Sequence, residues 1–325
     1  METKVIKWGI IGAGKIALKF AEDLNTVENA KLYGVASRNL KKAKSFALKL
    51  NADVAYGNYE DLALDPNIDA IYIATPHSFH KAHSLLCLNH KKAVLCEKPF
   101  AMNSDEVKEM IATSRQNNTL LMEAMWTIFL PHYQYVLQLI KNKHFGNVIK
   151  LEADFGFHPV YDETSRVFDK SVGGGSLLDI GIYPVFAALS SLGEPNHIEA
   201  DAQFFSSGAD AECKMVFHYN NAKAYLKSTL LEETKTEAIF HCENGMIKIN
   251  SRFHEPSTVT LTDKNGNSEL LDFKYTTIGY SYEIEHFNQL IRDGKKESDV
   301  MPFNKSLQLI STLDHIRKII GLDYS

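Results

Sequence analysis

A glycine-rich run near the start of the chain has the composition of a phosphate-binding turn. Residues 12–17 read Gly-Ala-Gly-Lys-Ile-Ala, fit the pattern GxGxxG/A and follow an apolar run at residues 5–11. The first glycine allows a tight turn, and the second lets the backbone approach a pyrophosphate, which the N-terminus of the next helix binds through its free N–H groups. The run predicts a dinucleotide site that contains Gly12, Ala13, Gly14, Lys15 and Ile16.

The residues after the second expected strand discriminate between NAD and NADP. A site for NAD expects Asp or Glu about 20 residues after the glycines, but this strand ends in Ala36-Ser37-Arg38, with Lys41 and Lys42 close behind. A hydroxyl, a guanidinium and an ammonium suit a 2′-phosphate. A solvated helix start is the alternative, although lysines there oppose the helix dipole unless an anion is present. We predict NADP(H) rather than NAD(H), bound in part by Ser37, Arg38 and Lys42.

Two further motifs follow strands at the edge where open α/β sheets bind ligands. Residues 74–80 read Ala-Thr-Pro-His-Ser-Phe-His, and we expect Thr75, Pro76, His77 and His80 to contact the cofactor. A metal site built from His77, His80 and His83 is disfavoured, because histidines at i, i+3 and i+6 drift around a helix and no carboxylate or cysteine accompanies them. We expect no bound metal.

The second motif is Cys96-Glu97-Lys98-Pro99 at the end of a later strand. A partly desolvated lysine beside a cofactor could hydrogen-bond a reacting oxygen and lower the pKa of a neighbouring acid. Without that context, Glu-Lys-Pro would be an ordinary strand end. We place Glu97 and Lys98 at the cofactor site.

A parallel sheet would bring these motifs to one edge, and the first third of the chain has the required alternation of strands and helices. The expected strands are 5–11, 31–37, 70–74, 93–96 and about 119–124, and the expected helices are 16–24, 40–50, 81–89 and about 104–117. They predict a Rossmann domain at residues 1–121.

The remaining residues, 122–325, predict a second α/β domain that binds substrate and mediates oligomerisation. Its expected strands are 148–157, 200–205, 211–219, 222–231 and 238–242, with helices at about 131–141, 282–293 and 304–320. Asn220-Asn221, Asn244-Gly245 and Asn265-Gly266 are turn signals of antiparallel hairpins. We therefore expect a mostly antiparallel open sheet with helices on one face.

The glycine run together with Glu97-Lys98-Pro99 resembles the glucose–fructose oxidoreductase/inositol dehydrogenase (Gfo/Idh/MocA) family over nearly the whole chain. Residues 173–183, Gly-Gly-Gly-Ser-Leu-Leu-Asp-Ile-Gly-Ile-Tyr, look like the second signature of that family. Many members have His where this chain has Tyr183. Tyrosine there, with residues 123–127 and 279–283, resembles the subgroup of dimeric dihydrodiol dehydrogenase and NADP-dependent D-xylose dehydrogenase.

The resemblance implies hydride transfer between a substrate carbon and the nicotinamide, with Lys98 as a catalytic residue and a cis bond between Lys98 and Pro99. Tyr183 is then the general acid/base. Because the unperturbed pKa of tyrosine is about 10, it needs help near neutrality, which Lys98 can give. Asp179 lies four residues before Tyr183, on the same helix face, and would orient the pair. Helix capping and core filling are the alternative roles of Asp179 and Tyr183.

Three other side chains are candidate substrate or nicotinamide contacts, besides Tyr183. Trp126 follows the expected domain junction, where clefts often form, and Arg166 precedes the glycine turn and could face a hydroxyl or phosphate. Phe157 ends an expected strand, although aromatic residues are more often core. Ile128 departs from the subgroup, which often has a basic residue after Trp-Thr, and this puts the substrate in doubt.

Composition limits the other functions open to this chain of 325 residues. A net charge of −5 argues against a nucleic-acid partner bound through a broad basic surface, and four scattered cysteines indicate reduced thiols. With no secretory leader and no run of membrane-spanning length, we expect a cytoplasmic protein without a membrane partner. The second domain should have an exposed sheet face, and members of the family commonly pair such faces between subunits. We therefore expect a homodimer or homotetramer.

We therefore predict an NADP(H)-dependent dehydrogenase or reductase acting on a CH–OH carbon of a small-molecule sugar, polyol or vicinal diol. The alternative is a non-catalytic NADP-binding regulatory protein of the same fold, which has no need of Lys98 and Tyr183 as a proton relay. A non-redox lyase with tightly held NAD is disfavoured by Arg38.

Overall fold

The computed structural model describes residues 3–162 and 164–324, and these form two compact units. The first comprises Met1–Trp126 and Thr276–Leu307, and the second comprises Thr127–Tyr275 and Gln308–Ser325. The single boundary expected near residue 121 lies close to the first crossing between the units. The later crossings, at residues 275–276 and 307–308, were not predicted.

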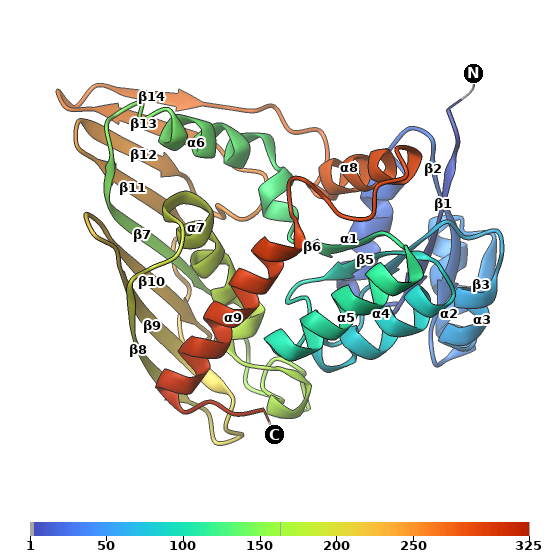
Figure 1. The fold of residues 1–325 in the computed structure, drawn as a ribbon. Coiled ribbons are helices and arrows are strands. Elements are labelled where there is room, and N and C mark those ends of the chain that lie inside the picture. Colours follow the sequence, from blue (N-terminus) through green and yellow to red (C-terminus); the bar gives the residue numbers. More distant parts are fainter. Residues whose placement is uncertain (1–2, 163, 325) are drawn as a thin grey trace. The chain divides into compact units, whose positions relative to one another are not determined.

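The first unit is built on a six-stranded parallel sheet with the strand order β3-β2-β1-β4-β5-β6, which is the Rossmann order (Figure 1). Its strands are β1 (Ile6–Ile11), β2 (Ala30–Ala36), β3 (Val54–Tyr56), β4 (Ala70–Ile73), β5 (Ala93–Glu97) and β6 (Leu121–Ala124). Its helices are α1 (Lys15–Leu24), α2 (Leu40–Leu50), α3 (Tyr59–Leu64), α4 (His80–Asn89), α5 (Ser104–Asn117) and α8 (Tyr280–Arg292). The predicted Rossmann fold is confirmed.

Two short elements of this unit were not predicted, β3 and α3. They are three and six residues long, so neither shows a full period of apolar residues. Helix α8 lies far along the chain, and Asp23 of α1 accepts hydrogen bonds from the backbone N–H groups of Ile278 and Ser281 at its start. This buried carboxylate fixes the beginning of α8 within the first unit.

The second unit contains an eight-stranded sheet with the order β14-β13-β12-β11-β7-β10-β9-β8. Its strands are β7 (Val148–Gly156), β8 (His197–Phe204), β9 (Asp210–His218), β10 (Lys223–Thr229), β11 (Ala238–Cys242), β12 (Gly245–Ile249), β13 (Val259–Asp263) and β14 (Ser268–Leu271). Only the pairing of β7 with β10 is parallel among these described strands. The expected mostly antiparallel sheet is confirmed, and all three Asn-containing turn signals join hairpins.

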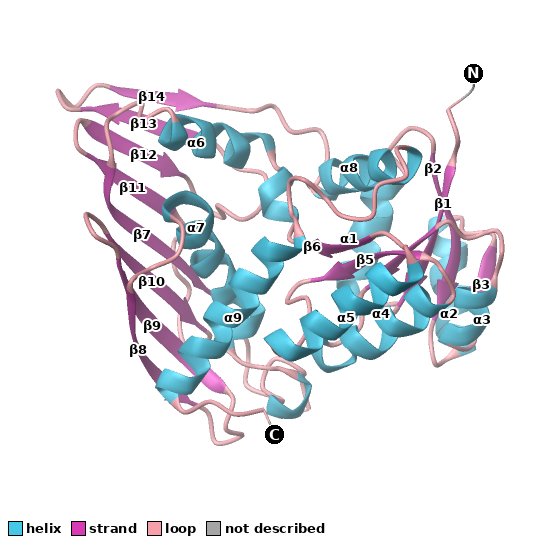
Figure 2. Cartoon of the chain, viewed as in Figure 1, coloured by secondary structure: helices cyan, strands magenta, loops and turns pink. Residues whose placement is uncertain are grey.

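Helices α6 (Pro131–Lys141) and α7 (Ile182–Leu192) lie against the same face of this sheet (Figure 2). Helix α9 (Phe303–Ile320) begins in the first unit and ends in the second. A π-helical turn, Leu177–Gly181, runs directly into α7. The stretch Lys170–Leu192, which includes this turn and α7, is long and apolar enough to span a membrane, contrary to the expectation from the sequence, but 94% of its apolar window is buried inside the structure.

Candidate functional site

The glycine turn lies between β1 and α1 at the carboxyl edge of the first sheet. Gly12 has φ +100°, and a β-carbon there would lie 2.6 Å from the carbonyl oxygen of Ala74, so only glycine fits. Gly14 is the N-cap residue of α1 and offers no side-chain hydrogen bond to the helix start, and a β-carbon on it would meet nothing within 4 Å. Ala13, Lys15 and Ile16 lie in or beside this turn. The open space at Gly14 and the uncapped N–H groups of α1 fit a dinucleotide pyrophosphate.

The predicted 2′-phosphate residues follow β2, at the same edge. Ser37 is buried and its hydroxyl accepts the N–H of Asn39, while Asn39 caps α2 by accepting the N–H of Lys42. Arg38 is exposed, and its guanidinium lies 5.9 Å from the centre of the Phe79 ring. No acidic residue stands in the first turn of α2. This charge distribution fits an anion beside Arg38.

The motif after β4 forms a short 3-10 turn, His77–Phe79, that leads into α4. His80 is fully buried, its Nδ1 lies 2.8 Å from the carbonyl oxygen of Pro99 and its Nε2 lies 2.9 Å from that of Thr75. The hydroxyl of Thr75 lies 3.0 Å from Nδ1 of His83. Burial lowers the pKa of His83 to about 4. Pro76 precedes the turn, and the His77 ring lies 5.7 Å from that of His80.

Lys98 follows β5 on a turn held by buried carboxylates. The N–H of Lys98 donates to Glu97 at 3.1 Å, and the N–H of Phe100 donates to Glu123 at 3.1 Å. Glu97 also accepts a hydrogen bond from the hydroxyl of Tyr72. The Lys98–Pro99 peptide bond is cis, as the resemblance implied. Burial raises the pKa of Glu123 to about 7.

The second unit carries Asp179, on the π-helical turn, and Tyr183, in the first turn of α7. Both are buried, with 7% and 6% of their surface exposed. Arg166 donates from both terminal guanidinium nitrogens to Oδ1 of Asp179, at 3.2 Å each. A residue predicted to face substrate thus forms an ion pair with the predicted orienting carboxylate.

The start of this helical segment is fixed by Asp210 of β9, which the sequence analysis missed. Its Oδ2 accepts the hydroxyl of Ser176 at 2.7 Å and the N–H of Leu177 at 2.6 Å. A β-carbon on Gly175 would lie 2.1 Å from Oδ1 of Asp210, so the glycine run lets the carboxylate reach the helix. No sequence signal marks Asp210, because only the pairing of the strands in the folded sheet brings it to the start of this helical segment.

Aromatic and charged side chains surround Tyr183. The rings of His254 and Phe155 have their centres 4.5 and 5.8 Å from that of Tyr183. The guanidinium of Arg252 lies 6.0 Å from the Phe155 ring, and the charge of Arg252 is coupled to Tyr183. Phe157, which was predicted as a substrate contact, lies next to Phe155, with ring centres 6.4 Å apart. The loop residues Arg252 and His254 were missed, since nothing in their spacing links them to Tyr183.

Trp126 stacks on Tyr280 in the first unit, with ring centres 4.4 Å apart and planes 18° apart. Tyr280 is the first residue of α8, so this contact joins the two segments, 123–127 and 279–283, that resemble the subgroup. Ile128 is buried, with 1% of its surface exposed. The side chain that departs from the subgroup is therefore a core residue of the second unit.

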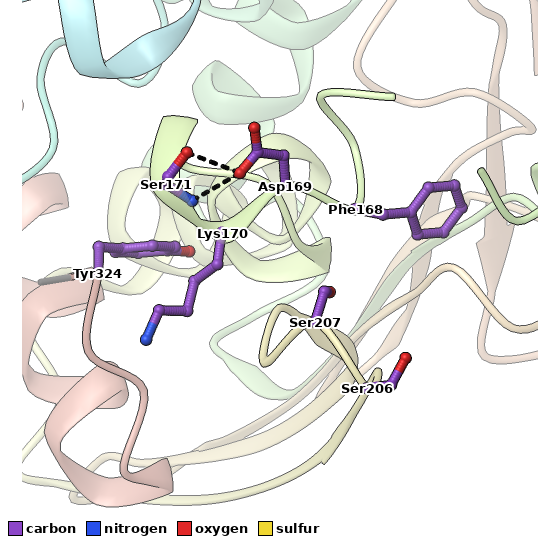
Figure 3. Close-up of a pocket in the computed structure, with 7 residues that line it drawn as sticks. All are labelled: Phe168, Asp169, Lys170, Ser171, Ser206, Ser207 and Tyr324. Carbon is purple, nitrogen blue, oxygen red and sulfur yellow. Dashed lines mark hydrogen bonds between the residues drawn. The ribbon is translucent and has the colours of Figure 1, made fainter. Parts of the chain in front are cut away.

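Two cavities in the part of the chain that the structure describes are lined by none of the predicted site residues. One, of about 530 Å³, is in the second unit and is lined by Phe168, Asp169, Lys170, Ser171, Ser206, Ser207 and Tyr324 (Figure 3). The other, of about 390 Å³, includes Asp69, Lys91 and Thr119, which precede β4, β5 and β6. It therefore lies at the edge of the first sheet opposite to the glycine turn.

All four cysteines are free and buried. Among residues 3–162 and 164–324, no group of three or more His, Cys, Asp or Glu side chains is placed to hold a metal ion. Both ring nitrogens of His80 and Nδ1 of His83 instead face protein oxygen atoms.

Comparison with known proteins identifies the family. Residues 6–125 match the model of the oxidoreductase family with an NAD-binding Rossmann fold, GFO_IDH_MocA, and residues 133–248 match the GFO/IDH/MocA C-terminal domain. The chain belongs to the GFO/IDH/MocA family. The resemblance inferred from the glycine run, Glu97-Lys98-Pro99 and residues 173–183 is confirmed.

Two curated relatives within the GFO/IDH/MocA family match over almost their full lengths. The trans-1,2-dihydrobenzene-1,2-diol dehydrogenase of Xenopus tropicalis is 37% identical over 98% of this chain and 99% of its own. The scyllo-inositol 2-dehydrogenase (NADP(+)) of Bacillus subtilis is 33% identical over 98% of both chains. The expected subgroup is confirmed by the first of these.

Solved structures show the same GFO/IDH/MocA fold at lower identity. An aldose-aldose oxidoreductase from Caulobacter crescentus has a TM-score of 0.89 at 20% identity and covers 98% of both chains. A 3-ketoreductase from Actinomadura kijaniata, crystallised with NADP and TDP-benzene, has a TM-score of 0.87 at 23% identity and covers 97% of this chain and 98% of its own. These likenesses support the fold of both units.

Proposed function

We propose that this protein is an NADP(H)-dependent dehydrogenase that transfers hydride between the nicotinamide and a hydroxyl-bearing carbon of a cyclic vicinal diol. The observation that carries the proposal is the full-length match to two named dehydrogenases, one of which has NADP(+) in its name. The exposed Arg38 after β2, with no acid in the first turn of α2, supports the same cofactor.

The substrate class follows from what the two named substrates share. Trans-1,2-dihydrobenzene-1,2-diol and scyllo-inositol are both six-membered carbon rings with hydroxyls on adjacent carbons in trans. A sugar in its ring form presents the same arrangement. We therefore place a ring with neighbouring trans hydroxyls ahead of open-chain polyols.

Lys98, Tyr183 and Asp179 are the proposed catalytic residues. NADP(H), when bound, supplies or accepts the hydride at nicotinamide C4. Nζ of Lys98 hydrogen-bonds the reacting oxygen and stabilises the charge that develops there. The Tyr183 hydroxyl holds the proton that this oxygen gains or loses. Asp179, held by Arg166, orients the hydroxyl through the first turn of α7.

The remaining predicted residues divide between cofactor and substrate. The glycine turn and α1 would bind the pyrophosphate, Ser37, Arg38 and Lys42 the 2′-phosphate, and the loop after β4 the nicotinamide half. We propose Trp126 and Phe157 as apolar contacts of the substrate ring or nicotinamide. We also propose that residues 1–121 form the core of the cofactor domain and that residues 122–325 contain the surfaces that bind substrate and mediate oligomerisation. The proposed protein is a cytoplasmic homodimer or homotetramer.

The test is NADP⁺ reduction, followed at 340 nm, with a panel containing scyllo-inositol, a trans-dihydrodiol, D-xylose and an open-chain polyol. We expect reduction with at least one ring diol and loss of at least about 100-fold in Lys98→Met and Tyr183→Phe, because each removes a group used in proton transfer. Glu109→Gln, an exposed change on α5, is the control. NADPH binding without turnover of any diol or its ketone would instead support the regulatory protein.

A further inference from the structure

The turn that presents Lys98 is held by three buried ionisable side chains. Its two N–H groups, from Lys98 and Phe100, donate to Glu97 and Glu123. Its central carbonyl, from Pro99, faces Nδ1 of His80 at 2.8 Å. His80 and Glu123 have 0% and 2% of their surface exposed, so water does not replace these contacts. The turn is therefore fixed by one imidazole and two carboxyl groups.

Both ring nitrogens of His80 face groups that can only accept hydrogen bonds. Nδ1 lies 2.8 Å from the carbonyl oxygen of Pro99, and Nε2 lies 2.9 Å from that of Thr75. A neutral imidazole has one N–H and one lone pair. In either tautomer the lone pair would face a carbonyl oxygen at hydrogen-bond distance. Only the doubly protonated ring donates to both.

We propose that His80 is a buried imidazolium that joins the Thr75 loop to the Lys98–Phe100 turn and acts as a positioning residue for Lys98. Its role toward Lys98 rests on the proposed function, whereas its protonation state does not. The Thr75 loop adjoins the glycine turn, because the methyl group of Thr75 would lie 3.4 Å from a β-carbon on Gly12. His80 thus connects the predicted phosphate-binding and lysine-bearing loops.

Burial by itself opposes a charged imidazole, so the charge needs compensation. The carboxyl groups of Glu97 and Glu123 bind the residues on either side of Pro99, and two carbonyl dipoles point at the ring. The other ionisable groups on the neighbouring elements are His77, His83, Cys96, Lys98, Tyr59, Lys81, Glu106 and Glu109. Of these, Lys81 pairs with the two glutamates of α5.

The protonation state is tested on the full chain labelled with ¹⁵N-histidine, by long-range ¹H–¹⁵N spectra at pH 7.5. Loss of a signal in His80→Gln identifies His80, and His83→Gln identifies a neighbour whose pKa burial lowers to about 4. We expect both nitrogens of His80 to be protonated, although this pH is one unit above the usual histidine pKa of about 6.5. For His83 we expect one protonated nitrogen. An unprotonated nitrogen on His80 would overturn the proposal.

The positioning role is tested by hydrogen exchange of the peptide that contains Lys98 and Phe100. In His80→Gln we expect exchange of these two amides to rise by about ten-fold, with no change in His83→Gln. The same rise is expected in the unmodified chain when the pH is raised until His80 loses its proton, after correction for intrinsic exchange. Unchanged protection in both experiments would refute the positioning role. Neither readout needs substrate or cofactor, so a failed dehydrogenase assay leaves the result interpretable.

Discussion

Arg38→Ala should convert a preference for NADPH into near-equal binding of NADPH and NADH. Arg38 is exposed, so the hydrogen bonds that it would make to a 2′-phosphate are partly screened by water. Hydrogen bonds to charged groups contribute about 1.5–3 kcal/mol, and we take the lower part of that range, about 1.5–2 kcal/mol. At about 1.4 kcal/mol per factor of ten, NADPH binding weakens by about 10–30-fold.

The fold should tolerate this change, because the guanidinium of Arg38 contacts the ring of Phe79 at the surface, and an exposed cation–π pair contributes about 0.5–1 kcal/mol. The assay is a fluorescence titration with NADPH and with NADH, together with urea unfolding. Arg38→Lys keeps the charge without the planar fork and should give an intermediate loss. Lys49→Ala, in the last turn of α2, is the control. Equal weakening of NADPH and NADH, or an unmodified protein that prefers NADH, would refute the assignment of Arg38.

Three further predictions concern the glycine turn, the helix start and a buried histidine. Gly12→Ala should lower the free energy of unfolding by about 1–3 kcal/mol, because a φ of +100° is strained for alanine. Gly14→Ala should change the free energy of unfolding by less than about 1 kcal/mol and abolish NADPH binding. Urea unfolding and NADPH titration measure both effects, and a destabilised Gly14→Ala protein that still binds NADPH would contradict the pyrophosphate site. Asp210→Ala removes the acceptor of the Leu177 N–H and one of the partners of the Ser176 hydroxyl, which keeps its contact with Ser228, and should cost about 1–3 kcal/mol in urea unfolding, while the exposed control Asp201→Ala costs little. Burial lowers the pKa of His132 to about 4, so between about pH 6.5 and 4 the unfolded chain binds a proton that the folded chain does not. The free energy of unfolding therefore decreases as the pH is lowered, by about 2 kcal/mol at pH 5. His132→Gln should lose that part of the pH dependence, and an identical profile would show that His132 does not cause it.

Much of the first unit could be predicted because its chemistry is local. The turn at Gly12 needs a glycine for steric reasons, and the apolar periods of α1, α2 and α5 are complete within single segments. The hairpin turn at Asn244-Gly245 was likewise readable from its own residues. By contrast, β14 has largely exposed residues, so it shows no buried period that a sequence pattern could reveal.

The surroundings of the candidate catalytic residues could not be predicted, because they depend on pairings between distant segments. His254 reaches Tyr183 from the loop after β12, and Asp210 reaches Ser176 from β9. Arg166 pairs with Asp179, a partner that the sequence did not indicate, since a spacing in sequence does not say which of several partners a long side chain takes. The contact of His80 with the Pro99 carbonyl likewise appears only when β4 and β5 are adjacent.

The central claim is hydride transfer to a ring carbon, and isotope transfer tests it most directly. The protein is incubated with NADPH that carries deuterium at nicotinamide C4, in separate 4R and 4S forms, and with a keto-inositol whose reduction gives a ring with neighbouring trans hydroxyls. We predict that one of the two forms yields a product with a single deuterium on the new carbinol carbon, and that Tyr183→Phe yields none above background. A reduced product without deuterium from either form, or no product while NADPH binds, would contradict the account.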